Sequence, residues 1–453
     1  MKLERGLKHQ NEAVNSIIRV LEDVRIEKTN SLTANPSIDL SSPNIVNNIK
    51  KIQSNNNISK EMNKNVGVFD NYLNIDVKME TGTGKTFTQI KTIYELNLKY
   101  GFSKFIIVVP TLPIKAGTKQ FISSIDTRKF FEDEYEQVEM EMRLVESVKK
   151  RKGRDYFPSV IREFVTASTL NTKKIQVMLI NSQLITNGKM LTKNYDTTIL
   201  DDLTNPSEAI KSTKPILIID EPHKFAKENI TFQKIKDILS PQCIIRFGAT
   251  FPEKKNHEKD YQNLVYNLGS IEAFNNNLVK GVIAEYVPTY SKNNLKIKLI
   301  NIKNKEKCTI QRIDEKSKKT FELSKNDSLS IIHEDFDGIK IIGITKNSIL
   351  LSNGIEINNG TELSPENYSQ SYQEMMIETA LERHFEIEKE NFEKGIKTLA
   401  LFFIDDISSY RKIDGKPTYI LNSFESILKR KINEKINELS DSEYKNYLIQ
   451  SRD

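Results

Sequence analysis

The chain has 453 residues, 38% of them hydrophobic, and its 67 basic and 61 acidic residues leave a net charge of +6. This composition excludes a wholly disordered protein, and two distant cysteines, Cys243 and Cys308, exclude a disulfide scaffold and a CxxC zinc site. The charged N-terminus lacks the apolar core of a signal peptide, and no run approaches the roughly 20 apolar residues of a membrane span, so we expect a cytoplasmic protein with no membrane partner.

The first part of the chain predicts one helix followed by a long loop. Apolar residues at helical spacing from Val14 to Val24 predict a helix over residues 9–26. Residues 28–66 are rich in Asn, Ser and Lys and show little apolar periodicity. We therefore expect an N-terminal helix within residues 1–27 and a low-complexity loop or partly ordered insertion over 28–66.

Five short apolar runs predict a buried sheet within residues 67–285. One strand ends near Met79, and the other four runs are Phe105–Val109, Ile175–Ile180, Ile216–Ile219 and Cys243–Phe247. Continuous apolar strands that alternate with helical or loop stretches are typical of a parallel sheet covered on both faces. The sequence therefore predicts an α/β lobe in this part of the chain.

The pattern changes near residue 286. Residues 295–302 alternate between polar and apolar side chains, as do parts of 330–357, which predicts an antiparallel β-rich insertion over residues 286–370. Residues 372–392 then predict another helix.

A further apolar run, Leu399–Ile404, indicates a buried strand that would begin a second α/β lobe over residues 371–453. Only 49 residues follow Ile404 in the 453-residue chain, whereas a lobe takes on the order of 100 to 150 residues. We therefore expect this second lobe to be incomplete, as in a truncated chain or the front part of a longer protein.

The stretch Lys78–Gln89 reads KMETGTGKTFTQ and has the features of a phosphate-binding loop. Glycines let backbone N–H groups approach a triphosphate, and the helix that follows points its positive end at the phosphates. We expect Lys85 to meet the β- and γ-phosphates of ATP and the Thr86 hydroxyl to ligate Mg²⁺. The predicted ATP-binding residues of the loop are Thr81, Gly82, Thr83, Gly84, Lys85 and Thr86. The common pattern opens with glycine, where this chain has Met79, and the alternative is a glycine-rich turn with an incidental lysine.

A second motif, ILIIDEPH at residues 216–223, supplies the carboxylates that a nucleotide hydrolase needs. Asp220 emerges from an apolar strand and is expected to hold the metal, and Glu221 to act as general base on the attacking water. His223 could transmit the state of the γ-phosphate to a neighbouring motif. The alternatives are an ordinary acidic pair at a strand end and a histidine with a structural hydrogen bond.

Together these motifs resemble helicase superfamily 2. The match is more selective for the restriction (Res) subunit of type III restriction-modification enzymes, which the DEPH variant, IIVVPT at 106–111, FGATFP at 247–252 and IKTLALFFIDDISSYR at 396–411 resemble. The resemblance implies an α/β fold with a RecA-like P-loop lobe, a parallel sheet, a β-rich insertion and the start of a second RecA-like lobe.

The resemblance also implies roles for single residues. Gln10 matches the position that reads the adenine. Two elements match positions that contact the nucleic-acid backbone, and their residues are Pro110, Thr111, Lys115, Asn181, Ser182 and Gln183. Gly248, Ala249 and Thr250 match the motif that couples hydrolysis to movement along DNA. Each match has an alternative: a helix-surface amide for Gln10, a solvated charge for Lys115 and a strand-ending turn for Gly248–Thr250.

The function that the resemblance implies is an ATP- and Mg²⁺-dependent motor on double-stranded DNA, acting in a hetero-oligomer with a methyltransferase (Mod) subunit. Neither the glycine-arginine motif of the second lobe nor a nuclease motif is found in this chain, and loss of a transition-state arginine can cost ~10³-fold in rate. Two alternatives stay open. One is a non-catalytic remnant that binds nucleotide or Mod, and the other is a different superfamily 2 protein, such as an RNA helicase or a type I restriction motor.

Overall fold

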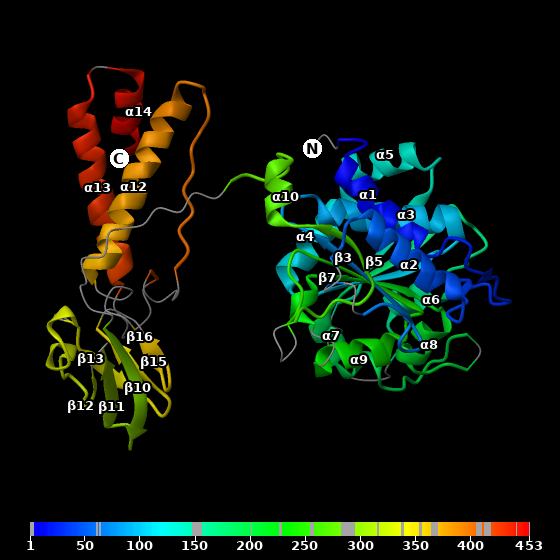
Figure 1. Ribbon diagram of the computed structural model, residues 1–453, viewed down its shortest axis with the longest axis horizontal. Coiled ribbons are helices and arrows are strands. Elements are labelled where there is room, and N and C mark those ends of the chain that lie inside the picture. The colour runs from blue at the N-terminus through cyan, green and yellow to red at the C-terminus, as the bar shows by residue number, and fades with distance from the viewer. Residues whose placement is uncertain are drawn as a thin grey trace. The chain divides into compact units, whose positions relative to one another are not determined.

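The computed structural model describes residues 4–59, 62, 65–146, 156–200, 202–225, 229–253, 258–281, 295–314, 317–336, 339–352, 356–363, 370–404, 410–411, 418–440 and 442–452. The chain divides into two compact units, Met1–Val282 and Ile283–Asp453, and both contain helices and strands (Figure 1). Within these described ranges, no helix combines the length and the apolar character needed to cross a membrane.

The first unit is built on a seven-stranded parallel sheet with the strand order β5-β6-β4-β7-β8-β3-β9. The strands are β3 (Leu73–Met79), β4 (Lys104–Val109), β5 (Glu139–Leu144), β6 (Lys174–Asn181), β7 (Ile216–Asp220), β8 (Cys243–Gly248) and β9 (Leu264–Leu268). The five apolar runs correspond to β3, β4, β6, β7 and β8, so the predicted parallel sheet and the α/β class are confirmed. The two edge strands were not predicted. Strand β5 alternates charged and apolar residues and is only half-buried, as an edge strand allows, whereas β9 is a short apolar strand that is buried.

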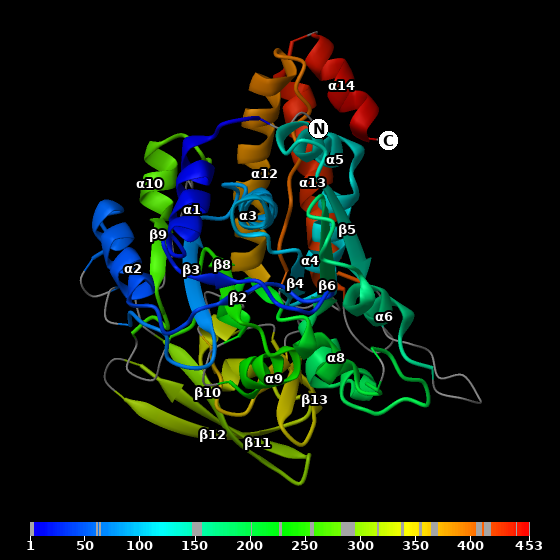
Figure 2. The same ribbon diagram turned by 90° about the vertical axis from the view of Figure 1, so that its right-hand side faces the viewer.

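Helices cover both faces of this sheet. Figures 1 and 2 show α1 and α3 on one face and α8 and α9 on the other. The first face carries α1 (Lys8–Arg19), α2 (Pro43–Asn55), α3 (Lys85–Tyr100), α4 (Leu112–Ser123), α5 (Ile125–Glu134) and α10 (Ser270–Asn275). The second face carries α6 (Ser159–Thr166), α7 (Ser182–Thr186), α8 (Pro206–Ser212) and α9 (Ile230–Leu239), and the short helices η1 (Lys189–Leu191) and η2 (Pro222–Lys224) also belong to this unit.

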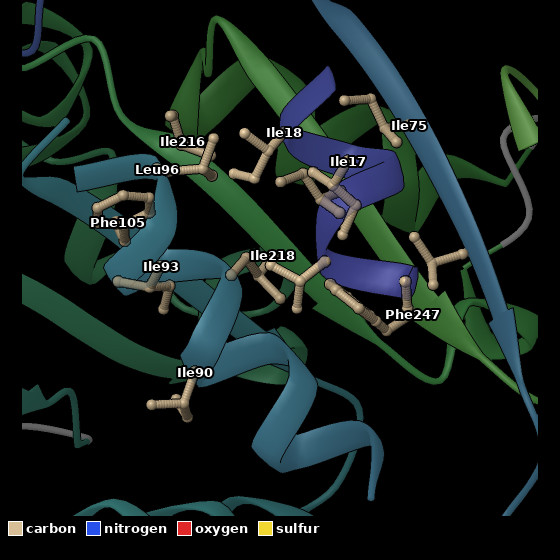
Figure 3. Packing of buried hydrophobic residues seen from close by; sticks show 14 of the residues in the cluster. Ile17, Ile18, Ile75, Ile90, Ile93, Leu96, Phe105, Ile216, Ile218 and Phe247 are labelled. Carbon is tan, nitrogen blue, oxygen red and sulfur yellow. The ribbon is translucent and has the colours of Figure 1, made fainter. Parts of the chain in front are cut away.

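Alternation along the strands explains why there are two cores. In β4, Phe105 and Ile107 belong to one apolar cluster and Ile106 and Val108 to the other, since successive side chains of a strand point to opposite faces. Figure 3 shows the first cluster, in which isoleucines of α1 and α3 pack against apolar side chains of the sheet. This packing fixes α3, the helix that follows the glycine loop, against the strands that end beside it.

The N-terminal region agrees with its predictions only in part. The predicted N-terminal helix is present as α1, but it ends at Arg19 and not near residue 26, and the following residues lead through turns into β1 (Ile26–Glu27). The predicted loop over 28–66 is wrong, because this stretch contains β2 (Ser37–Ile38) and the 13-residue helix α2.

Helix α2 has helical periodicity that its composition conceals. Pro43 occupies its first turn, where the missing N–H costs nothing, and Ile45, Ile49 and Ile52 recur on one buried face. Gln53 and Asn56 attach the helix to the sheet by donating to backbone carbonyls of β9, at Leu264 and Val265 respectively. The prediction of a loop relied on the asparagine-rich composition of this stretch, whereas the helix forms because its three isoleucines are buried on one face.

The β-rich part of the second unit contains two small antiparallel sheets, in agreement with the predicted alternation. One has the order β12-β11-β10-β16 and the other β13-β14-β15. Their strands are β10 (Lys296–Lys303), β11 (Lys307–Ile313), β12 (Lys318–Ser324), β13 (Ile341–Ile344), β14 (Ser348–Leu351), β15 (Glu356–Asn358) and β16 (Glu362–Leu363), with the short helices η3 (Leu329–Ile331) and η4 (Glu334–Phe336). A single apolar cluster joins the two sheets.

The rest of the second unit contains the helices α12 (Gln370–Phe392), α13 (Tyr419–Glu438) and α14 (Glu443–Arg452). The predicted strand Leu399–Ile404 is not a strand: it runs without pairing, and Leu399 and Phe403 are 80% and 90% exposed. Such an apolar run needs neighbouring strands on both sides, and none of the described residues supplies one to it. Residues 405–409 of the motif at 396–411 lie outside the described residues, and the second RecA-like lobe stays a prediction.

Candidate nucleotide-binding site

The loop between β3 and α3 has the backbone that its glycines predict. Gly82 and Gly84 have φ values of 87° and 88°, in the left-handed region that residues with a Cβ atom rarely adopt. A Cβ atom at Gly84 would also lie 2.3 Å from Nε2 of Gln10. Helix α3 begins directly after this loop at Lys85, so its unpaired N–H groups and positive end lie beside the loop, as in an anion-binding site.

Helix α1 holds the loop from one side. Nε2 of His9 lies 2.8 Å from the carbonyl oxygen of Thr83, and Nε2 of Gln10 donates to the same oxygen at 3.2 Å. Gln10 is 6% exposed, so the alternative that it is a helix-surface amide is wrong, while its contact with adenine stays a prediction. Nothing in the sequence indicates the contact of His9, because a single histidine near the start of a helix has no distinctive spacing.

The acidic motif after β7 meets the glycine loop. Nζ of Lys85 lies 3.8 Å from Oε1 of Glu221, and Nδ1 of His223 lies 3.3 Å from Oε2 of the same carboxylate. Glu221 has a φ of 53°, a left-handed conformation that a residue with a side chain adopts at a cost. This turn brings the carboxylate to the lysine, so the structure places together three residues that the sequence assigned to one site.

Asp220 lies deeper in the same site. It is 7% exposed, and its Oδ1 accepts a hydrogen bond of 2.9 Å from Nε2 of Gln89 on α3. Burial raises the pKa of Asp220 to about 6, with the negative charge of Glu221 adding to the rise and Gln89 and Lys85 opposing it. The cations and hydrogen-bond donors beside Asp220 therefore decide how fully its carboxyl group is ionised near neutral pH.

The oxygen atoms of this site suit Mg²⁺. No group of three or more His, Cys, Asp or Glu residues that could hold a metal by themselves occurs in the part of the chain that the structure describes. Mg²⁺ does not need such a group, because it takes one or two carboxylates and completes its shell with water and substrate phosphates. Asp220 and the half-buried hydroxyl residue Thr86 are the residues that would hold it beside a bound triphosphate.

The end of β8 contacts the acidic motif. The backbone N–H of Glu221 donates to the carbonyl oxygen of Phe247 at 3.0 Å. Gly248 follows, and a Cβ atom at this position would lie 2.5 Å from Cδ of Pro222. Ala249 and the exposed Thr250 come next, so the residues predicted to couple hydrolysis to movement follow directly from this contact. Their role in coupling stays a prediction, and so does the alternative of a strand-ending turn.

A second group of predicted residues lies at the same edge of the sheet, after the neighbouring strands β4 and β6. Oγ of Ser182 donates to the carbonyl oxygen of Pro110 at 3.5 Å. Thr111 and Gln183 follow these two residues and are exposed. Asn181 is buried, and its Oδ1 has no hydrogen-bond partner among the described residues.

Lys115 lies apart from this exposed pair. It is 6% exposed on α4, its ammonium donates to the backbone carbonyl of Val145, and burial lowers its pKa. Both the predicted contact with nucleic acid and the alternative of a solvated charge need an accessible ammonium. The structure contradicts both, because the lysine is used to join α4 to the residue that follows β5.

Comparison with known proteins identifies the family. Residues 6–253, more than half of the chain, match the family model described as "Type III restriction enzyme, res subunit". The chain belongs to this Res-subunit family. The predicted resemblance is thereby confirmed.

Three Res subunits of type III restriction-modification enzymes are similar to this chain. Those of EcoP15I from Escherichia coli and EcoPI from Escherichia phage P1 are 40% and 38% identical, each over 98% of this chain and 46% of the relative. That of StyLTI from Salmonella typhimurium is 38% identical over 82% of this chain and 38% of the relative. The chain therefore spans less than half the length of these Res subunits.

The raised pKa of Asp220 predicts how this Res-family site responds to pH. Mg²⁺ needs the ionised carboxylate, so Mg²⁺-dependent binding of a fluorescent ATP analogue is expected to weaken about tenfold between pH 7 and pH 5, as the pH falls through about 6. The free energy of unfolding changes in the opposite direction. The pKa of Asp220 in the folded protein lies above the ordinary aspartate value of 3.8, so its protonated form stabilises the fold at pH below about 4, and this stability is lost as pH rises through about 6. Titrations in EDTA provide the control, and equal pH dependence with and without Mg²⁺ would contradict the prediction.

Proposed function

We propose that this Res-family chain is the ATP-driven motor portion of a type III restriction endonuclease. It hydrolyses ATP with Mg²⁺ to move along double-stranded DNA, in a cytoplasmic hetero-oligomer with a methyltransferase (Mod) subunit. The observation that supports this most is the convergence of Lys85, Asp220 and Glu221 at the carboxyl edge of one parallel sheet. The relatives, which are by name Res subunits of type III restriction-modification enzymes, support the same function.

The residues of the site divide the chemistry between them. The N–H groups at the start of α3 and the ammonium of Lys85 bind the phosphates of ATP. Glu221, whose carboxylate lies between Lys85 and His223, orients the attacking water and accepts its proton. Mg²⁺, when bound with ATP, neutralises charge on the phosphate oxygens.

The strand order explains how hydrolysis would be coupled to DNA. The glycine loop follows β3, the segment after Gly248 follows β8, and the acidic motif follows β7; these three strands are neighbours in the sheet. The exposed residues Thr111 and Gln183 follow β4 and β6, the next two strands along the same edge. Because β7 pairs with both β8 and β4, it lies between the ATP half and the DNA half of this edge. We expect small polar residues there to contact phosphates of the DNA backbone.

Lys85→Ala tests this proposal. The substitution removes the charge that meets the β- and γ-phosphates, so DNA-stimulated ATP hydrolysis by the chain assembled with DNA and Mod is expected to fall at least about 10²-fold. Lys99→Ala, which changes an exposed lysine in the last turn of the same helix, is the matched control and should leave turnover unchanged. Unchanged hydrolysis in the Lys85 variant would remove the basis of the proposal.

The nucleic acid that stimulates hydrolysis distinguishes the remaining alternatives. Stimulation by duplex DNA supports the restriction motor, whereas stimulation by RNA alone supports a helicase acting on RNA. Binding of ATP without turnover under either condition supports the non-catalytic remnant. The observation that motivates the last alternative is the short second lobe that the sequence predicts, with 49 residues after Ile404.

A further inference from the structure

The residue that holds Asp220 has no role in the predicted site. Gln89 lies one helical turn after Lys85 on α3, so the two side chains share a face of that helix. Lys85 contacts Glu221 and Gln89 contacts Asp220, at 3.8 Å and 2.9 Å. Two successive residues on one helix face thus contact two successive acidic residues of the motif after β7.

The amide of Gln89 is buried beside the apolar core of this face of the sheet. Gln89 is 1% exposed, and its sequence neighbour Ile90 and the nearby Ile93 belong to the apolar core of this face. An apolar side chain would fill the same space without the cost of burying an amide. Packing alone therefore does not explain why a glutamine occupies this position.

Only one end of this amide has a partner. An ionised carboxylate can only accept hydrogen bonds, so the NH₂ group of Gln89 faces Asp220. Oε1, the other end, is buried and has no hydrogen-bond partner among the described residues. A buried acceptor without a donor indicates a missing water or ligand, and the water molecules bound to a cation are strong donors.

From these contacts we propose that Gln89 is a positioning residue for the hydrated Mg²⁺ of the nucleotide complex. Its NH₂ group fixes the orientation of the Asp220 carboxylate, and its Oε1 accepts a hydrogen bond from water of the Mg²⁺ shell. This role rests on the proposed ATPase function. Gln89 would act on the metal through Asp220 and a bound water, and it is not assigned to the phosphates or to the attacking water.

The test measures metal dependence of nucleotide binding rather than turnover. In the 453-residue chain, binding of a fluorescent ATP analogue is titrated with Mg²⁺ and, separately, in EDTA. Gln89→Met keeps the size of the side chain and removes both hydrogen bonds, so the Mg²⁺ concentration for half-maximal enhancement of binding should rise about tenfold or more, as for other outer-shell residues. Metal-free binding should stay within about twofold. Gln89→Ala carries the same expectation if the methionine variant does not fold.

Two further variants separate positioning from a structural effect. Thr92→Val changes another buried polar side chain of α3, whose hydroxyl donates to the backbone oxygen of Thr88, and should leave the Mg²⁺ dependence unchanged. In an Asp220→Asn background, Gln89→Met should have little additional effect, because both residues act on the same ion.

An unchanged Mg²⁺ requirement in the Gln89 variants would overturn the inference, and so would an equal loss of binding with and without Mg²⁺, which indicates a displaced helix. Absence of nucleotide binding in the unmodified chain would instead be a failure of the proposed ATPase function.

Discussion

Glu221→Gln is expected to lower ATP turnover by about 10² to 10⁴-fold while nucleotide still binds, because the amide cannot accept the proton of the attacking water. The substitution preserves the size of the side chain and an oxygen near Lys85, whose Nζ lies 3.8 Å from Oε1 of Glu221. The variant should therefore accumulate in the ATP-bound state. Single-turnover hydrolysis and equilibrium binding of ATP, measured on the chain assembled with DNA and Mod, give the two quantities separately.

The control for this variant is Glu208→Gln, which changes an exposed glutamate in the first turn of α8. It should retain full turnover. If Glu221→Gln hydrolyses ATP at a normal rate, another group must activate the water, and the assignment of the general base fails. If it loses ATP binding altogether, its carboxylate acts mainly by holding Lys85.

Motifs with a local cause could be predicted from the sequence. The glycine loop was predictable because Gly82 and Gly84 take left-handed φ values that other residues resist, and Lys85 follows at a fixed spacing. The central strands were predictable because burial on both faces requires a continuous apolar run, as in Ile216–Ile219. In both cases the residues themselves impose the structure.

Features that depend on distant partners could not be predicted in the same way. The role of Gln89 depends on its hydrogen bond to Asp220, 131 positions away in the sequence. Its spacing of four residues from Lys85 could have suggested only that the two share a helix face. The sequence could not show that Lys115 is buried, because its ammonium donates to the backbone carbonyl of Val145, 30 positions away. The run Leu399–Ile404 has the composition of a strand, but pairing partners decide whether a strand forms.

Arg246 is the most buried example of such a distant partnership. It lies in β8 with 0% exposure, and its guanidinium donates to both carboxylate oxygens of Asp76 in β3, at 2.7 and 2.6 Å. It also donates to the backbone oxygen of Asp260 at 2.6 Å. Burial acts to lower the pKa of Arg246, but the charges of Asp76 and Asp260 outweigh it, so the pKa is raised and the arginine stays charged.

This buried ion pair joins the two strands that lead into the nucleotide site. Asp76 precedes the end of β3 by three residues and Arg246 precedes the end of β8 by two. The glycine loop follows the first strand and Gly248–Thr250 follow the second. Backbone pairing sets the register of β3 against β8, and the ion pair joins the same two strands through their side chains. Removing either partner leaves the other as a lone buried charge, which is strongly destabilising.

Arg246→Ala is therefore expected to destabilise the first unit by about 3 to 5 kcal/mol, since it leaves the buried carboxylates of Asp76 and Asp260 without this cation. Asp76→Ala should cost a similar amount. The double variant Arg246→Met with Asp76→Leu should cost less than the sum, because it removes both members of the closest pair together, while Asp260 loses its contact with Arg246 in both Arg246 variants. Denaturant unfolding of each variant, followed by circular dichroism, measures these free energies. Lys259→Ala, which breaks an exposed ion pair with Glu253 nearby, is the control and should have little effect. Additive losses in the double variant would show that the two residues stabilise the sheet independently and that the ion pair is not the link between its strands.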